Sequence, residues 1–204
     1  GLWVNARHPE RNGDVILLID AQIESQTGLV DLIDRSVRLG AALLHGHARR
    51  RHRLGIITLD GLCRWIGPGA GEFHRRRLIE QLLAVYPGQV IWDAVERAVV
   101  RAAKRPSMVT AVTPMLDANM AGLLNVLRRS GVDVAAVELD VAGYLPAAER
   151  HDRDLGRRIW LMERERIRER LSGAGVPVAV WERDAPAEIP LQQLETWRTS
   201  WRRR

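Results

Sequence analysis

The stretch Asp14-Val-Ile-Leu-Leu-Ile-Asp20 decides the fold, because five consecutive apolar residues stand between two acids. Such a run predicts a strand that is buried on both faces, and strands of this kind lie in the middle of parallel sheets. Along the rest of the chain, apolar runs alternate with helical patterns, which is typical of βαβ units. We predict further strands at 54–59, 62–66, 108–112, 132–139 and 176–181, and helices at 29–44, 72–85, 92–103, 118–128, 155–171 and 191–201.

These elements in this order predict an open, doubly wound α/β domain with a mostly parallel central sheet and helices on both faces. The segment Gly67-Pro-Gly-Ala-Gly71 is expected to end the short strand before it and to connect tightly to the next helix, without binding phosphate. In that helix we expect four inward-facing residues, which are Leu78, Ile79, Leu82 and Leu83. Cys63 has apolar neighbours and is expected to be a buried thiol.

The composition indicates one folded domain and excludes several classes of protein. With 204 residues, 46% of them hydrophobic, the chain is long enough and apolar enough to bury one core. The formal net charge is +6, yet all but one of the 31 basic residues are arginines, and most are spread among acids along the helices. We therefore expect no nucleic-acid binding. No apolar run approaches the length of a transmembrane helix, and the single cysteine excludes an internal disulfide.

The domain is predicted to cover residues 1–183, with 1–13 as a lead-in segment. Residues 184–204 are expected to form a linker and a C-terminal amphipathic helix that carries Leu194, Trp197 and Trp201 on one side. Packing of this side on the domain is favoured over binding to an anionic membrane surface. Because the chain begins at Gly1, we expect it to be a soluble fragment or a processed product.

Several segments together resemble the bacterial "domain of unknown function 58" family, and in particular its actinobacterial members. The resemblance rests on the order and spacing of segments across nearly the whole chain, which are Leu2-Trp-Val-Asn5, His8-Pro-Glu-Arg-Asn12, Asp14–Asp20, Arg53-Leu-Gly-Ile-Ile57, Leu62–Gly71, Thr113-Pro-Met-Leu-Asp117, Gly131–Glu138 and Gly175-Val-Pro-Val178.

This resemblance implies a von Willebrand factor A-like, or Rossmann-like, fold without an established catalytic activity. Family members commonly carry an upstream membrane-anchoring segment, which implies a place at the cytoplasmic face of the plasma membrane for a full-length protein. They are often encoded beside AAA+ ATPases of the MoxR type, which implies such an ATPase as a partner in protein assembly or maturation. We therefore expect a non-catalytic protein-interaction module.

The resemblance also directs attention to the end of the first strand, where von Willebrand A domains often hold a divalent cation in an Asp-x-Ser-x-Ser motif. Here the segment reads Asp20-Ala-Gln22-Ile-Glu24, so the aspartate remains and both serines are replaced. Thr113 and Asp117 follow a later strand. One hypothesis is that Asp20, Gln22 and Glu24, together with Thr113 or Asp117, still bind Mg²⁺, the carboxylate ligands being Asp20, Glu24 and Asp117.

The favoured hypothesis is a degenerate site without a cofactor, in which Asp20 accepts backbone N–H bonds from the next loop while Gln22 and Glu24 are solvated. The same surface, from Asp20 to Glu24 and from Thr113 to Asp117, could then dock a protein. The alternative function is a divalent-metal-dependent hydrolase that uses this end of the sheet.

Two other groups of residues suggest chemistry, but we expect neither to be a site. His45, His47 and His52 are predicted to be surface histidines at a helix end, because His45 and His47 point to nearly opposite sides of a helix. Asp31 and Asp34 are acids at a helix start, where the helix dipole favours them.

Overall fold

The computed structural model describes residues 13–23, 30–103, 107–144 and 151–201. Within these ranges the strands are β1 (Asp14–Asp20), β2 (Arg53–Leu59), β3 (Cys63–Gly69), β4 (Ser107–Thr113), β5 (Asp133–Leu139) and β6 (Val178–Trp181). The helices are α1 (Val30–Arg49), α2 (Glu72–Leu83), α3 (Trp92–Ala102), α4 (Ala118–Arg129), α5 (His151–Gly173) and α6 (Glu188–Trp201), with a short 3₁₀ helix η1 (Ala142–Tyr144).

The strands form one sheet in the order β3-β2-β1-β4-β5-β6, so β1 lies in its interior as predicted. All neighbouring strands are parallel except β3, which runs antiparallel to β2. The sequence prediction of an α/β fold with a mostly parallel sheet is therefore confirmed. The strand order is the one that doubly wound Rossmann-like folds adopt.

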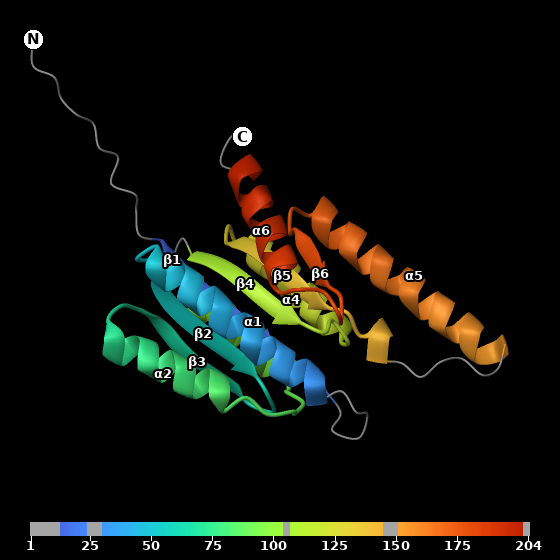
Figure 1. Ribbon diagram of the computed structural model, residues 1–204, viewed down its shortest axis with the longest axis horizontal. Helices are drawn as coiled ribbons and strands as arrows, with labels where there is room; N and C mark the ends of the chain where they lie inside the picture. Colours follow the sequence, from blue (N-terminus) through green and yellow to red (C-terminus); the bar gives the residue numbers. More distant parts are fainter. Residues whose placement is uncertain (1–12, 24–29, 104–106, 145–150, 202–204) are drawn as a thin grey trace, which may run out of the picture.

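Helices cover both faces of the sheet (Figure 1). One core lies between the sheet and α1, α2 and α6, and it takes Leu17 and Ile19 from β1. The other lies between the sheet and α3, α4 and α5, and it takes Ile16 and Leu18. The uninterrupted apolar run of β1 thus serves two cores at once, because successive side chains of a strand point to opposite faces.

The segment around Pro68 differs from its prediction. It does not end the strand, because β3 continues to Gly69 and includes the proline. A proline lacks a backbone N–H, and the edge position of β3 does not require one on its outer side. Cys63 is half-buried on this edge strand rather than fully buried.

Two helices bury fewer of their apolar residues than their sequences suggest. In α2, Leu78 and Leu82 are buried as predicted, while Ile79 and Leu83 are exposed. In α5, Leu171 is buried in the core. Three apolar residues in the first half of this helix are exposed, which are Leu155, Ile159 and Met162. The reason is geometric, since a helix on a sheet buries one stripe with i, i+4 spacing and leaves its other faces to solvent.

The histidine prediction needs one correction, because His47 is buried. Its ring lies 5.4 Å from the ring of His52, centroid to centroid, in an edge-to-face arrangement. His45 is exposed as expected. The two acids at the start of α1 have different partners. Asp31 accepts a hydrogen bond from Tyr144, and Asp34 forms an ion pair with Arg38 one turn further along α1.

The C-terminal helix α6 contributes Leu194 to the core, with Leu191 packed beside it. The side chains of Trp197 and Trp201 lie outside the described residues. Among the helices that the structure describes, none has the length and apolarity needed to cross a bilayer.

Candidate functional site

Polar side chains gather where the parallel strands end. The carboxyl ends of β1, β2, β4 and β5 meet at one edge of the sheet, which is where ligands bind in doubly wound folds. Asp20, Asp60, Thr113 and Glu138 stand at these four ends, and all four are buried. Each of them therefore requires a hydrogen-bond partner inside the protein.

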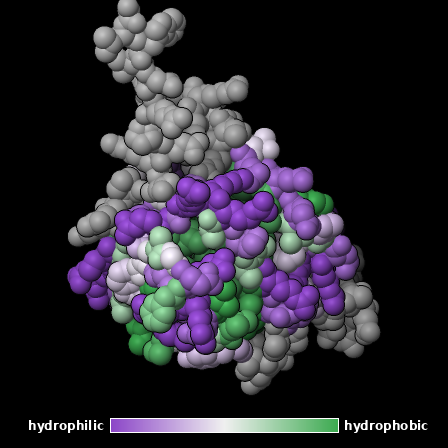
Figure 2. Space-filling model, turned by 60° about the vertical axis from the view of Figure 1, so that its left-hand side comes forward, coloured by the Kyte–Doolittle hydropathy of each residue, from purple (hydrophilic) through white to green (hydrophobic). Residues whose placement is uncertain are grey.

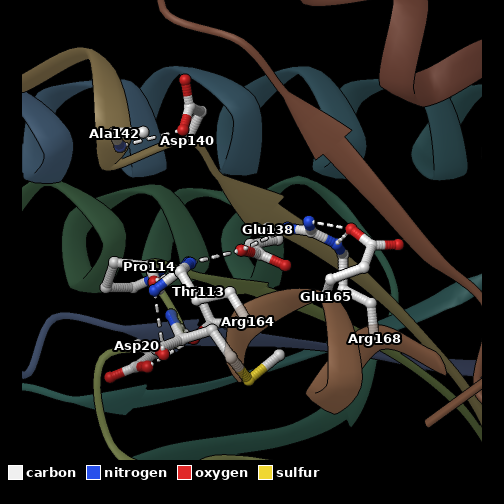
Figure 3. Close-up of polar contacts among 10 residues, drawn as sticks. Asp20, Thr113, Pro114, Glu138, Asp140, Ala142, Arg164, Glu165 and Arg168 are labelled. Carbon is white, nitrogen blue, oxygen red and sulfur yellow. Dashed lines mark hydrogen bonds and ion pairs between the residues drawn. The ribbon is translucent and has the colours of Figure 1, made fainter. Parts of the chain in front are cut away.

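Asp20 obtains its partners from its own loop and from β4. Its Oδ1 accepts hydrogen bonds from the backbone N–H of Gln22 at 3.1 Å and from the side-chain amide of Gln22 at 3.2 Å. Its Oδ2 accepts from the hydroxyl of Thr113 at 2.6 Å (Figure 3). The Thr113 hydroxyl in turn accepts from the N–H of Met115 at 2.8 Å. Asp20 therefore ties the end of β1 to the connection that follows β4.

The prediction for the segment from Asp20 to Glu24 is confirmed in part. Asp20 accepts a backbone N–H bond from the next loop, as expected. Gln22, in contrast, is buried and bonds to Asp20 instead of to solvent. Glu24 lies outside the described residues. Asp20, Gln22 and Thr113 are buried, so their side chains expose little area to a partner, whereas Asp117 is partly exposed.

Asp117 serves the start of α4. Its Oδ1 accepts from the backbone N–H of Asn119 at 2.8 Å, which makes it the N-cap of the helix. Its Oδ2 accepts from the indole N–H of Trp92 at 2.6 Å. Both carboxylate oxygens thus already have N–H donors.

The carboxylate oxygens of the hypothetical Mg²⁺ site take part in hydrogen bonds within the protein. Mg²⁺ prefers oxygen ligands in octahedral geometry, and the carboxylate oxygens of Asp20 and Asp117 accept N–H and O–H bonds from protein groups, so a bound ion would have to share or displace these bonds.

Burial raises the pKa of Asp20 above its ordinary value of 3.8. Hydrogen bonds from Thr113 and Gln22 act in the opposite direction, and the charge of Asp117 adds to the increase. The folded state therefore holds this proton more tightly than the unfolded chain, and ionisation of Asp20 at neutral pH disfavours folding.

The raised pKa of Asp20 gives a testable pH dependence for the Asp20→Asn variant. Asparagine has the same shape and no charge, so the free energy of unfolding of the variant minus that of the wild type is expected to be largest at pH 7. It should decrease as the pH falls through the raised pKa towards 3.8, because the wild-type carboxyl is then protonated in the folded state. Urea unfolding of both proteins at pH 7 and pH 4 measures this difference, and a constant difference would contradict the prediction.

A buried ion pair that the sequence pattern does not predict stands beside Asp20. Glu138 at the end of β5 pairs with Arg164 of α5, and both side chains are buried. Arg168, one turn further along α5, approaches the same oxygen of Glu138 at 3.2 Å (Figure 3). An acid at the end of a buried strand signals that a cationic partner exists, yet nothing in the sequence distinguishes Arg164 from the many arginines of α5.

The same edge of the sheet carries an apolar rim, which we define as Leu62, Leu83, Tyr86, Ile91 and Leu116. Their side chains are exposed, by between 39% and 80%. They come from the β2–β3 turn, the end of α2, the α2–α3 connection and the β4–α4 connection. Figure 2, which brings the left-hand side of Figure 1 forward, shows small groups of apolar side chains among hydrophilic ones on that face.

Contacts between the connections hold the members of the rim together. Tyr86 lies against Gly61, since a Cβ atom at Gly61 would be 3.4 Å from the tyrosine hydroxyl, and Leu62 is the next residue. The N–H of Gly88 donates to the carbonyl of Ala21 at 3.2 Å, which fixes the α2–α3 connection over the end of β1.

The hydrogen bond between Trp92 and Asp117 completes this arrangement. These two residues follow Ile91 and Leu116, so the bond brings the second pair close together. The rim therefore borders the buried cluster of Asp20 on the outer surface.

A comparison with protein-family models matches residues 1–169 to the family described as "Protein of unknown function DUF58". The chain belongs to this family. A comparison with curated proteins finds no match.

The matched part of this DUF58 chain ends inside α5, five residues after Arg164. It contains Asp20, Thr113, Glu138 and the rim, together with the strands from β1 to β5. Strand β6 and helix α6 lie beyond the matched residues.

Proposed function

We propose that this chain is a non-catalytic protein-interaction module of a membrane-associated bacterial protein, and that a partner protein docks on the apolar rim. The observation that carries the proposal is the gathering of five exposed apolar side chains at one edge of the sheet. Soluble proteins rarely leave large apolar patches in water without a partner. In this proposal the partner covers side chains from three connections.

The chemistry of the buried cluster supports binding rather than catalysis. Asp20 and Thr113 bond to each other and are shielded from solvent, so neither reaches a substrate. Their contribution is to fix the loops that carry the rim. This proposal keeps the carboxyl end of the sheet as the docking edge and moves the contact from polar to apolar residues.

We further propose a MoxR-type AAA+ ATPase as the partner, with assembly or maturation of other proteins as the process served. The family resemblance supports this choice, and it also supports attachment to the cytoplasmic face of the plasma membrane through an upstream segment. An ATPase partner implies that docking depends on the bound nucleotide, because such enzymes change shape between nucleotide states.

Charged substitutions in the rim test this proposal. Ile91→Asp and Leu116→Asp are each expected to weaken binding of the purified MoxR-type ATPase by about tenfold or more, since a charge then has to be buried in an apolar contact. Binding is measured by interferometry with and without ATP, using the immobilised chain.

Phe73→Asp provides the matched control, because Phe73 is 77% exposed and lies about 15 Å from Leu83 along α2, at the far end of that helix. This variant should bind as the wild type does. If Ile91→Asp, Leu116→Asp and Phe73→Asp all bind the ATPase with the wild-type affinity, the proposal is wrong.

A titration with metal ions separates the proposal from a metal-dependent hydrolase. We expect isothermal calorimetry with Mg²⁺ and Mn²⁺ to show no saturable binding heat, because the oxygens of Asp20 and Asp117 already accept protein hydrogen bonds. A stoichiometric site that disappears in Asp20→Asn would favour the hydrolase.

A further inference from the structure

The connection between β4 and α4 contains an unfavourable backbone conformation. Met115 has a φ angle of 51°, which lies in the left-handed region, although it is not a glycine and its side chain is buried. A residue other than glycine adopts this region at a cost of about 1 kcal/mol or more, and it stays there only where its surroundings hold it. The next residue is Leu116 of the rim.

Arg164 supplies two of the contacts that hold this conformation, in addition to the bond from the Met115 N–H to the Thr113 hydroxyl. Its guanidinium donates to the carbonyl of Pro114 at 2.7 Å and to the carbonyl of Met115 at 3.2 Å (Figure 3). These bonds come from α5, a helix that follows the connection by more than thirty residues. One side chain therefore binds the carbonyls of the two residues that precede Leu116.

Arg164 is itself fixed from two directions. Its Nε donates to Glu138 at 2.9 Å, and Glu138 stands at the end of β5 in the sheet. Its guanidinium carbon lies 4.6 Å from the centre of the Trp160 ring. A guanidinium is well suited to this position, because its fork of N–H donors can bind a carboxylate and two carbonyls at once, which an ammonium cannot do with the same geometry.

From this geometry we infer that Arg164 is a positioning residue of the docking site. It sets the β4–α4 connection so that Leu116 takes its place in the rim, and it does so without contacting the partner. The inference rests on the proposed function for its binding consequence, whereas its structural half can be tested alone.

Hydrogen exchange tests the structural half. In Arg164→Lys, amides in a peptide covering residues 113–120 are expected to exchange about tenfold faster or more, since the bonds to both carbonyls are weakened. Arg168→Lys is the matched control, because Arg168 also contacts Glu138, while its other hydrogen bonds among the described residues go to Glu165. It should change exchange of this peptide by less than about twofold.

Glu138→Gln is a second variant that retains an acceptor oxygen for Arg164 and removes the charge. It should give an intermediate rate for the peptide covering residues 113–120. Unchanged exchange of this peptide in both Arg164→Lys and Glu138→Gln would overturn the inference.

A double-mutant cycle on binding separates positioning from general stabilisation. We expect Arg164→Lys to weaken binding of the MoxR-type ATPase about fivefold in the wild-type background and less than about twofold in a Leu116→Ala background. Equal losses in the two backgrounds, or no loss in either, would overturn the positioning role. If Ile91→Asp and Leu116→Asp do not weaken binding, the proposed function fails, and the exchange experiment still decides whether Arg164 holds the connection.

Discussion

Replacement of Glu138 by alanine is expected to lower the free energy of unfolding by about 3–5 kcal/mol. The substitution leaves the Arg164 guanidinium buried without its carboxylate, and a buried charge without a partner is among the costliest defects in a protein. Arg168 loses its contact with the same oxygen. Urea unfolding at pH 7 measures the effect.

Glu165→Ala is the matched control for this substitution. Glu165 pairs with Arg168 on the same helix, but its side chain is 58% exposed. An exposed ion pair of this kind contributes about 0–1 kcal/mol, so the control should unfold at nearly the wild-type urea concentration. A loss of stability in Glu138→Ala no larger than that in Glu165→Ala would contradict the description of Glu138 as a buried anchor.

Substitution of Gly88 by alanine is expected to destabilise the protein by about 3 kcal/mol and to weaken docking as well. A Cβ atom at Gly88 would lie 2.7 Å from the nitrogen of Gly61 and 2.8 Å from the carbonyl oxygen of Asp60. These are backbone atoms at the end of β2, so the α2–α3 connection has to move instead. Because this connection carries Tyr86 and Ile91, its displacement should also disturb the rim.

Gly122→Ala is the matched control, since it makes the same change in an exposed position inside α4. Nothing lies within 4 Å of a Cβ atom at Gly122, and alanine favours the helix by about 0.5–1 kcal/mol over glycine. Thermal unfolding should therefore show a lower midpoint for Gly88→Ala and a slightly higher one for Gly122→Ala. A midpoint for Gly88→Ala equal to that of the wild type would mean that the connection is free to shift.

The strand at 14–20 and the backbone N–H bond to Asp20 could be predicted because both depend on neighbours in the sequence. Five apolar residues in a row indicate a strand buried on both faces, and the structure places β1 inside the sheet. The backbone N–H bond from Gln22 to Asp20 spans two residues, so a local loop suffices to make it. The side-chain amide of Gln22 turned inward for a reason that local sequence does not show, since the buried carboxylate required another donor.

The arrangement of α5 could not be predicted from its periodicity. The helix carries apolar residues on two faces, and only contact with β5 and the β4–α4 connection determines that the face with Arg164 and Leu171 is buried. The exposed face keeps Leu155, Ile159 and Met162 in solvent. Periodicity identifies the apolar faces of a helix but does not tell which of them meets the sheet.

The fold class, the family and the edge of the sheet that carries the site could be predicted from the sequence, because apolar runs, helical spacing and motif order are local properties of the chain. Which residues are exposed to solvent at that edge depends on the tertiary structure. The rim contains side chains from connections that are up to 54 positions apart, from Leu62 to Leu116. The hydrogen bond from Arg164 to the carbonyl of Pro114 spans 50 positions. Such proximities follow from strand order and helix placement, which arise only when the whole sheet is assembled.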